Sequence, residues 1–312
     1  MKKISIVTHC FNEEANVEPL YERVKAELDS IPKYDYELIY IDNASTDRTV
    51  AKVKGLIERD KNVRLIVNAR NFGHIRSPYH GLMQATGDAV ILMSTDLEDP
   101  PELISAFLRS WEQGFKIVAA VKTTTEKSKI FFAVRSAYYS LLQRMSDVKL
   151  IANFTGFGLY DKEIIKIMRG FDDPYPYLRG LICEIGFDVA TVEFKQPLRK
   201  RGITKNNFYT LYDMAILGIT NHSKVPLRIA LFGGFSLAVL SLCISFMYLV
   251  LKIIFWNSFV FGTAPLLIGL FFFSSVSLLL ISLISLVNLR FSVNKLSTFF
   301  LSNPVSPSDT SN

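Results

Sequence analysis

Two long apolar stretches near the C-terminal end limit what this chain can fold into more than any other feature. Ile229–Leu251 and Thr263–Leu289 contain no charged residue. A helix over the first stretch would be about 35 Å long, enough to cross a hydrocarbon core of about 30 Å. Buried core helices rarely reach this length without one polar side. The pattern therefore predicts two transmembrane helices and disfavours a pair of core helices.

Basic residues around these stretches predict the orientation of the chain in the membrane. Lys224 and Arg228 precede the first stretch and Arg290 and Lys295 follow the second, whereas the short loop between them carries only Lys252. The positive-inside rule then places the N-terminal domain and both termini in the cytoplasm. The opening residues turn polar too early for a signal peptide, which agrees with this orientation. We expect a multi-pass protein of the inner (plasma) membrane.

The charged residues lie almost entirely in residues 1–225, which predicts a cytoplasmic domain there. A two-helix membrane domain over 226–290 and a disordered cytoplasmic tail over 291–312 would follow it. The net charge of +6 points to anionic lipid or phosphate ligands, and the membrane spans argue against nucleic acid. Cysteines and histidines lack ligand spacing, so we predict no zinc site and no disulfide framework, and ordinary hydrogen-bonding histidines.

Strand-like and helix-like runs alternate through the N-terminal half of the chain. This alternation predicts a doubly wound α/β sheet with mostly parallel strands. Ligands of such sheets bind beyond the carboxyl ends of the strands, so residues 8–14, 42–49, 68–76 and 94–99 form one candidate site. The expected strands are Ile4–Thr8, Tyr36–Ile41, Val63–Asn68, Ala89–Met93 and Lys116–Val121, with helices at Thr46–Asp60 and Ile75–Ala85.

Three acids gather where the fourth expected strand ends. Asp96, Glu98 and Asp99 repel one another unless a cation binds them or water screens them in a surface turn. No glycine-rich dinucleotide loop and no phosphate-loop lysine follows any strand, which argues against a dinucleotide enzyme or an ATPase. A nucleotide diphosphate would then need another neutralising group, and Mg²⁺ or Mn²⁺ on carboxylates is the usual one.

Four motifs resemble, in chain order, those of the inverting glycosyltransferases of family 2. They are Val7–Glu14 (VTHCFNEE), Asp42–Thr49 (DNASTDRT), Arg70–Gly73 (RNFG) and Asp96–Glu102 (DLEDPPE). The most similar branch is the polyprenyl-phosphate glycosyltransferases, which include dolichol-phosphate mannose synthases and bactoprenol glucosyltransferases. The likeness covers the whole chain, because the bactoprenol enzymes also end in two membrane spans. It implies a GT-A fold, a nucleotide-diphosphate sugar and a divalent cation.

The resemblance also implies a role for each matching residue. Asp96 and Glu98 would hold Mg²⁺ or Mn²⁺, and Lys122 and Arg135 would hold the phosphate of the acceptor. Asp96 would also act in catalysis, together with two cations of a basic loop. Those cations are Arg201 and Lys205, and the residues implied for the donor nucleotide are Thr8, Cys10, Glu13, Asp42, Arg70 and Asn71.

Two departures from the family pattern bear on the chemistry. Ser94 stands where the family commonly has the first acid of its metal motif, and Glu98 would restore that charge. Later, Phe157 and Gly158 stand where the family often has an acid and an arginine. A hydroxyl acceptor would need that acid as a general base. A lipid monophosphate would not, because it is largely dianionic at neutral pH.

Two stretches have the pattern of helices at the membrane interface. Residues 127–146 and 207–223 combine basic residues, aromatic anchors and an apolar side, although core packing would give a similar pattern. Between them, residues 199–205 carry four cations around a glycine and resemble the family's loop over the diphosphate. A basic surface loop without function is the alternative for this segment.

The leading interpretation is an enzyme that transfers one sugar, glucose or a related hexose, to undecaprenyl or another polyprenyl phosphate. The donor would be a UDP-sugar by analogy with the bactoprenol branch, and the product would serve cell-surface glycan or lipid modification. One alternative is the same fold acting on another lipid acceptor. A second, motivated by Ser94 and Phe157, is a non-catalytic membrane subunit that binds sugar nucleotide or lipid. The sequence leaves open whether the chain forms a homo-oligomer.

Overall fold

The computed structural model describes residues 1–123, 151–171, 176–197, 225–256 and 263–302. The chain divides into two compact units, Met1–His222 and Ser223–Asn312. Several expected features lie outside the described residues. They are Arg135, Arg201 and Lys205, the interfacial helices at 127–146 and 207–223, and the basic loop at 199–205.

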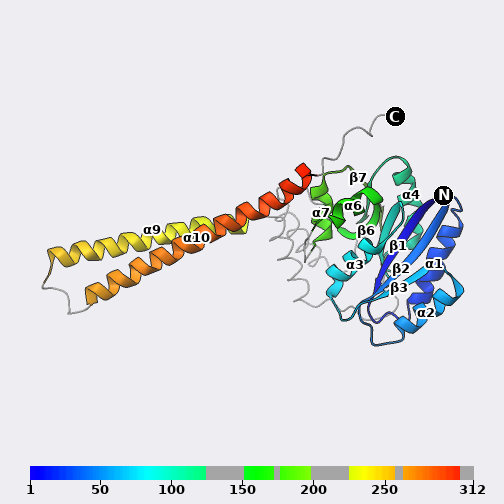
Figure 1. Ribbon diagram of the computed structural model, residues 1–312, viewed down its shortest axis with the longest axis horizontal. Coiled ribbons are helices and arrows are strands. Elements are labelled where there is room, and N and C mark those ends of the chain that lie inside the picture. The colour runs from blue at the N-terminus through cyan, green and yellow to red at the C-terminus, as the bar shows by residue number, and fades with distance from the viewer. Residues whose placement is uncertain (124–150, 172–175, 198–224, 257–262, 303–312) are drawn as a thin grey trace. The chain divides into compact units, whose positions relative to one another are not determined.

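The first unit is built on one seven-stranded sheet with helices on both faces, which confirms the predicted GT-A architecture (Figure 1). Its strand order is β3-β2-β1-β4-β6-β5-β7. Only β6 runs antiparallel to its neighbours, β4 and β5. The strands are β1 (Lys2–Cys10), β2 (Tyr34–Asp42), β3 (Val63–Val67), β4 (Ala89–Ser94), β5 (Ile117–Lys122), β6 (Phe154–Asp161) and β7 (Val189–Phe194).

Helices cover both faces of this sheet, so its central strands are apolar on both sides. Successive side chains of a strand point to opposite faces. Ile6 of β1 therefore packs in one core, whereas Val7 packs in the other. The described helices are α1 (Val17–Asp29), α2 (Thr49–Arg59), α3 (Gly73–Gln84), the short 3₁₀ helix η1 (Pro101–Leu103), α4 (Ile104–Glu112), α6 (Lys162–Arg169) and α7 (Leu178–Ile185).

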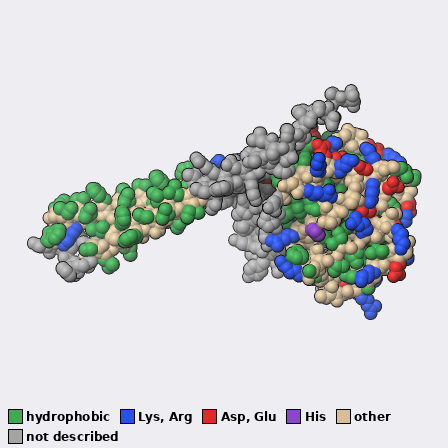
Figure 2. Space-filling model, in the orientation of Figure 1, with side chains coloured by type: hydrophobic (Ala, Val, Ile, Leu, Met, Phe, Trp, Pro, Cys, Tyr) green, Lys and Arg blue, Asp and Glu red, His purple; other side chains and the backbone are tan. Residues whose placement is uncertain are grey.

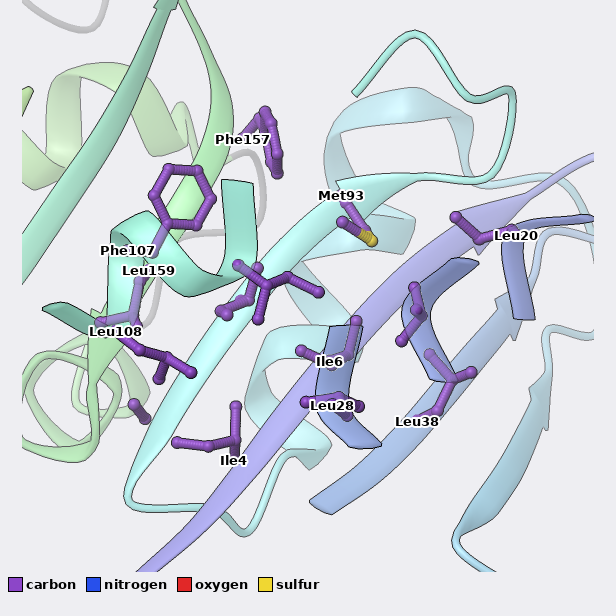
Figure 3. Packing of buried hydrophobic residues seen from close by; sticks show 14 of the residues in the cluster. Ile4, Ile6, Leu20, Leu28, Leu38, Met93, Phe107, Leu108, Phe157 and Leu159 are labelled. Carbon is purple, nitrogen blue, oxygen red and sulfur yellow. The ribbon is translucent and has the colours of Figure 1, made fainter. Parts of the chain in front are cut away.

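The core beneath α1 and α4 extends to β6. Figure 3 shows Leu20 and Leu28 of α1 and Phe107 of α4 against the strands, with Phe157 of β6 in the same cluster. The Phe157 ring is 5.1 Å from that of Phe107 and 5.6 Å from that of Phe194, both edge to face. Gly158 follows, and a Cβ there would collide with the carbonyl oxygen of Val118. Of the residues that depart from the family pattern, Phe157 therefore packs in the core, and Gly158 stands where a Cβ has no room.

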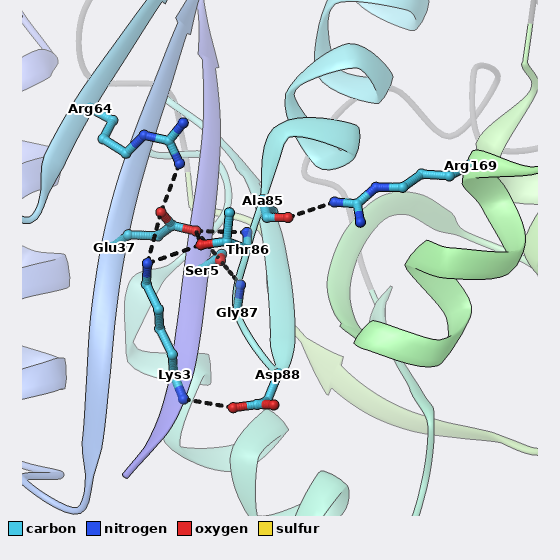
Figure 4. A network of polar contacts seen from close by, with 9 residues as sticks. All are labelled: Lys3, Ser5, Glu37, Arg64, Ala85, Thr86, Gly87, Asp88 and Arg169. Atoms are coloured by element: carbon cyan, nitrogen blue, oxygen red, sulfur yellow. Dashed lines mark hydrogen bonds and ion pairs between the residues drawn. The ribbon is translucent and has the colours of Figure 1, made fainter.

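A buried carboxylate ties together the sheet near the amino ends of its strands. Glu37 is 3% exposed and accepts hydrogen bonds from Ser5 Oγ at 2.6 Å and from the Thr86 backbone N–H at 2.8 Å (Figure 4). Its other oxygen lies 2.8 Å from Arg64 and 3.1 Å from Lys3. Burial alone would raise the pKa of Glu37, but the hydrogen bonds from Ser5, Thr86 and Arg64 lower it to about 2.

The second unit contains two long apolar helices, α9 (Val225–Ile254) and α10 (Thr263–Ser302). Segments Leu231–Ile254 and Pro265–Ile284 are long and apolar enough to cross a membrane, with mean hydropathies of 2.4 and 2.5. Most of the side chains that are visible on the described part of these helices are apolar (Figure 2). The predicted pair of apolar helices is confirmed.

Polar contacts between α9 and α10 are made by small residues. Ser241 Oγ donates to the Phe271 carbonyl at 2.7 Å, and Ser245 Oγ donates to the Ile268 carbonyl at 3.1 Å. Gly234 lies so close to α10 that a Cβ would collide with Ser282 Oγ. Small residues allow such close approach of helices in a membrane.

The helix α10 continues beyond the point where the sequence suggested a tail. It runs to Ser302, so it includes residues 291–302 of the segment expected to be disordered. No proline or glycine interrupts this part of the sequence before Pro304, so nothing forces the helix to end at residue 290.

Candidate active site

A pocket of about 500 Å³ opens at the carboxyl ends of β1 and β4. This is the edge at which ligands of such sheets bind. Of the residues that the sequence implied for the site, six line the pocket: Cys10, Glu13, Asn71, Asp96, Glu98 and Lys122.

Three further implied residues lie outside the lining. Thr8 is fully buried behind the pocket, and its hydroxyl is 2.8 Å from that of Thr95. Asp42 is also fully buried and accepts a hydrogen bond from the Ser45 backbone N–H at 2.9 Å. Arg70 is exposed, with its guanidinium 4.2 Å from the centre of the Phe72 ring.

The acidic segment forms a tight turn after β4. Asp96 Oδ1 accepts hydrogen bonds from Ser94 Oγ at 2.6 Å and from the Glu98 backbone N–H at 3.1 Å. Leu97 between them has a φ of 63°, in the left-handed region that a non-glycine residue seldom adopts. Because Oδ1 accepts both of these hydrogen bonds, the Asp96 side chain is held in one position at the carboxyl end of β4.

The other two acids are held in different ways. Asp99 is 8% exposed and accepts a hydrogen bond from the Ser94 backbone N–H at 2.9 Å. Burial raises the pKa of Asp99, and the positive charge of Lys122 opposes this effect. Glu98 accepts a hydrogen bond from the side-chain amide of Gln196, which follows β7. The pocket therefore has acids from the β4 turn and a lysine from the end of β5.

Hydrogen bonds from Thr95 fix this turn to β1. Its hydroxyl lies 2.8 Å from the carbonyl oxygen of His9 and 2.8 Å from the Thr8 hydroxyl. The Thr95 side chain is 1% exposed, so water does not compete for these bonds. The acidic turn therefore keeps its place on β1 without a ligand.

His9 differs from the ordinary hydrogen-bonding histidine that the sequence suggested. It lines the pocket, and its Nδ1 atom is buried without a hydrogen-bond partner in the described part of the chain. Burial lowers the pKa of His9, and the negative charge of Asp96 opposes this effect. Burial therefore favours the uncharged form of the ring.

The side of the pocket formed by β2 and β3 is preorganised by amides. Asn43 Nδ2 donates to Asn71 Oδ1 at 2.8 Å, and Asn43 Oδ1 accepts from the Phe72 backbone N–H at 2.8 Å. Cys10 Sγ lies 3.7 Å from Asp42 Oδ1, and burial raises the pKa of this thiol. Cys10 is thus a neutral packing residue, because only the thiolate is a nucleophile.

Several pocket residues were missed by the sequence reasoning. Thr155 of β6 lines the pocket, and its buried hydroxyl has no hydrogen-bond partner among the described residues. Arg179 at the start of α7 also lines it, and so does His74 at the start of α3, which lies in the predicted segment 68–76 but was given no role there. Polar residues at the starts of helices could have signalled these positions, but β6 and α7 were not predicted as elements.

No group of three or more His, Cys, Asp or Glu side chains converges on a metal position within the described residues. The hydrogen bonds described above engage Oδ1 of Asp96 and Oε2 of Glu98, and an ionised carboxylate has two oxygens that can accept hydrogen bonds or bind a cation. The chemistry of the donor set still suits a hard divalent cation.

Comparisons with known proteins agree with this fold. Over 90% of the chain, it is 32% identical to the uncharacterized glycosyltransferase YkcC of Bacillus subtilis (strain 168), covering 86% of that protein. It is 29% identical over 89% of its length to the bactoprenol glucosyl transferase of Shigella phage SfX, covering 90% of it. A crystal structure of a mycobacterial protein, 18% identical, shares the fold with a TM-score of 0.50 over 70% of this chain and 72% of that one.

The family assignment rests on the first of the two units. Residues 5–168 match the family model described as Glycosyl transferase family 2, and this range holds most of β1, the strands β2–β6 and the acidic turn. The chain belongs to glycosyl transferase family 2.

Proposed function

We propose that this protein transfers a single hexose from a nucleotide-diphosphate sugar to a polyprenyl phosphate at the cytoplasmic face of the membrane. The proposed donor is a UDP-sugar, the proposed sugar is glucose or a related hexose, and the anomeric centre is inverted. The observation that carries the proposal is a pocket lined both by the acids of the β4 turn and by Lys122, in a family 2 chain with two apolar helices. The similarity to a bactoprenol glucosyl transferase supports the lipid acceptor.

The proposed domain arrangement follows the sequence. Residues 1–225 form the cytoplasmic catalytic domain, 226–290 the membrane domain and 291–312 a cytoplasmic tail, so both termini face the cytoplasm. The basic residues that flank the apolar helices support this orientation. A lipid carrier would then present its phosphate on the same side of the membrane as the domain that holds the donor.

Asp96 and Glu98 are the proposed holders of a divalent cation, Mg²⁺ or Mn²⁺. Their carboxylate oxygens are the hard ligands that both cations prefer. A buried nitrogen of the same pocket, His9 Nδ1, also lacks a hydrogen-bond partner among the described residues. When bound, the cation would neutralise the departing diphosphate. Glu13, Asn71 and Cys10 would contact the nucleoside.

The acceptor needs little activation in this mechanism. A lipid phosphate is largely dianionic at neutral pH, so it attacks the anomeric carbon without a general base. Phe157, which stands where a family acid is expected, is 2% exposed in the core and supplies none. Lys122, together with Arg135, would orient the acceptor phosphate for attack from the face opposite the diphosphate, which inverts the anomeric centre.

The test is transfer of radiolabelled sugar from a panel of UDP- and GDP-sugars to undecaprenyl phosphate by the purified full-length protein with Mg²⁺ or Mn²⁺. An acid-labile lipid product is expected with one donor, and it should be absent with Asp96→Ala. The matched control is Asp35→Ala, an exposed acid of β2 outside the pocket.

Two other outcomes would point to other functions. Transfer to diacylglycerol but not to undecaprenyl phosphate would support another lipid acceptor. Binding of nucleotide without transfer from any donor would overturn the enzymatic proposal. It would favour a non-catalytic subunit, as the loss of acids at Ser94 and Phe157 suggests.

A further inference from the structure

We propose that Thr49 is a positioning residue for the donor nucleotide, because its buried hydroxyl holds Glu13 in place at the wall of the pocket. This inference rests on the proposed function, in which Glu13 contacts the nucleoside. Thr49 is the last residue of the second sequence motif, where no role was assigned to it. It is fully buried at the start of α2 and does not line the pocket, so it would act through Glu13 alone.

The loop after β1 (residues 11–16) and the loop after β2 (residues 43–48) are joined by hydrogen bonds in both directions. Consecutive backbone N–H groups of the first loop donate to side chains at the second. They are Asn12 to Ser45 Oγ at 2.8 Å, Glu13 to Thr49 Oγ1 at 2.9 Å and Glu14 to Asp47 Oδ2 at 3.2 Å. In return, the backbone N–H groups of Thr46 and Arg48 donate to Asn12 Oδ1 at 2.7 Å and to Glu14 Oε2 at 3.0 Å.

Two residues of these loops have left-handed backbone conformations. The φ angles are 55° at Asn12 and 62° at Ala44. Asparagine tolerates this region, whereas alanine seldom adopts it. Such a conformation persists only where the surrounding structure holds the backbone firmly. The hydrogen bonds between the two loops supply that restraint.

The Thr49 hydroxyl connects the two loops directly at Glu13. It accepts the Glu13 backbone N–H and donates to Asp47 Oδ1. Thr49 is 0% exposed, so water cannot replace either bond. Because its proton is directed to Asp47, a lone pair of the hydroxyl is directed to Glu13.

The Glu13 side chain is held as well as its backbone. Its Oε2 atom accepts a hydrogen bond from Asn16 Nδ2 at 2.6 Å, and Asn16 is 2% exposed. A carboxylate accepts hydrogen bonds and repels phosphate, so Glu13 suits the hydroxyl and N–H groups of a ribose or a nucleobase. A group that is already in place loses less entropy when the ligand binds. Holding Glu13 should therefore increase the affinity for the nucleotide.

Helix capping explains only part of this arrangement. Asp47 Oδ1 also accepts the Thr49 backbone N–H at 2.9 Å, which satisfies the start of α2 without the Thr49 hydroxyl. The bond from Glu13 to that hydroxyl joins residues that are 36 positions apart in the sequence. A role in capping would not require this long-range bond, whereas a role in positioning Glu13 does.

The test measures UDP binding to the purified full-length protein with Mg²⁺ by isothermal titration calorimetry. Thr49→Val keeps the shape of the side chain and the backbone bond to Asp47, but it removes the acceptor of the Glu13 N–H. The UDP dissociation constant should rise roughly 10-fold. Thr49→Ser keeps the hydroxyl and should restore the affinity. The matched control is Thr86→Val, which removes a hydroxyl from Glu37 outside the pocket and should leave the UDP affinity unchanged.

A second variant loosens the same loops from the other side. Asn12→Gly keeps the left-handed backbone but removes the acceptor of the Thr46 N–H, so it should also weaken UDP binding. Its matched control is Asn153→Gly, the same substitution at a φ of 59° outside the pocket, which should leave UDP binding unchanged.

A double-mutant cycle separates positioning from a general loss of structure. Glu13→Ala removes the side chain that Thr49 would hold, so adding Thr49→Val should then change the UDP dissociation constant by no more than about 2-fold. In the transfer assay, Thr49→Val should raise KM for the sugar nucleotide and leave kcat unchanged, because Glu13 would contact the nucleoside and not the reacting atoms. An undiminished effect of Thr49→Val in Glu13→Ala, or failure of Thr49→Ser to restore binding, would overturn the proposal.

These results are independent of sugar transfer. Transfer by a wild type whose UDP affinity is unchanged in Thr49→Val would refute the role of Thr49 and leave the proposed function intact. UDP binding that depends on Thr49, without transfer from any donor, would support that role and refute the enzymatic proposal. The same measurements apply with GDP if the wild type binds GDP and not UDP, and a wild type that binds neither would overturn the inference. Circular dichroism of each variant would show that the fold is retained.

Discussion

The buried carboxylate of Glu37 allows a quantitative test of what stabilises the sheet. Its usual pKa of 4.5 falls to about 2 in the folded protein. This difference corresponds to roughly 3 kcal/mol of stability at neutral pH. Its partners Lys3 and Arg64 are 38% and 44% exposed, so water screens part of their attraction. We expect Glu37→Gln to lower the free energy of unfolding by about 2–3 kcal/mol at pH 7.

The pH dependence of this effect has a definite sign. A carboxyl group with a lowered folded-state pKa stabilises the fold fully above its unfolded pKa, here about 4.5. That contribution is lost as the pH falls through the folded pKa of about 2. Glu37→Gln has no titratable carboxyl group at this position, so it lacks this contribution to stability at every pH. The stabilities of wild type and variant should therefore converge as the pH falls from 4.5 towards 2.

Urea unfolding of the full-length protein in detergent would measure the loss of stability in Glu37→Gln at pH 7 and its change with pH. The chain has two tryptophans, so a Trp256→Phe background leaves Trp111, whose Nε1 donates to Asp161 in the first unit, as the reporter. Glu102→Gln, which removes an exposed ion pair with Arg23, is the matched control and should cost less than about 1 kcal/mol. A cost below about 1 kcal/mol for Glu37→Gln at pH 7, or a gap that is as large at pH 2 as at pH 7, would refute the reasoning.

Three further changes test the site and its supports. Asp96→Asn should lower sugar transfer on the order of 100-fold without changing the unfolding midpoint; full activity would contradict its role. Phe157→Asp should lower stability by at least about 3 kcal/mol, measured by urea unfolding, because it buries a charge in the core and removes a ring. Gly158→Ala should cost about 1–3 kcal/mol in the same assay, because its Cβ would collide with the Val118 carbonyl; an unchanged midpoint would show that the strands can separate.

Much of the fold could be predicted from the sequence because its signals are local. The alternation of apolar runs and helical patterns predicts β1 to β5, and the charge-free stretches predict α9 and α10. The strands β6 and β7 were not predicted. Phe154–Asp161 contains two glycines, and Val189–Phe194 is short and carries a glutamate, so neither resembles a buried strand in isolation. Their pairing with β5 is a long-range contact that no local pattern reports.

The candidate site was predicted only in part, because local sequence signals report some of its residues and long-range contacts bring in the others. The acids of the β4 turn and Lys122 follow predicted strands, and all of them line the pocket. His9 lies in the predicted segment 8–14, but no role was predicted for it, because the burial of its Nδ1 atom without a partner among the described residues depends on the register of β1 with β4. Arg179 was missed because α7 reaches the pocket from a distant part of the sequence.

The contacts between α9 and α10 have a consequence for how this chain can diverge. The outward positions, such as Phe232, Phe246 and Phe273, are more than 60% exposed and need only be apolar. They can exchange among leucine, isoleucine, valine and phenylalanine as lineages separate, with little effect on the pair. A side chain at Gly234 would require the Ser282 hydroxyl to move. Substitutions in α9 and α10 should therefore accumulate quickly at the outward positions and slowly at the positions where the two helices contact each other.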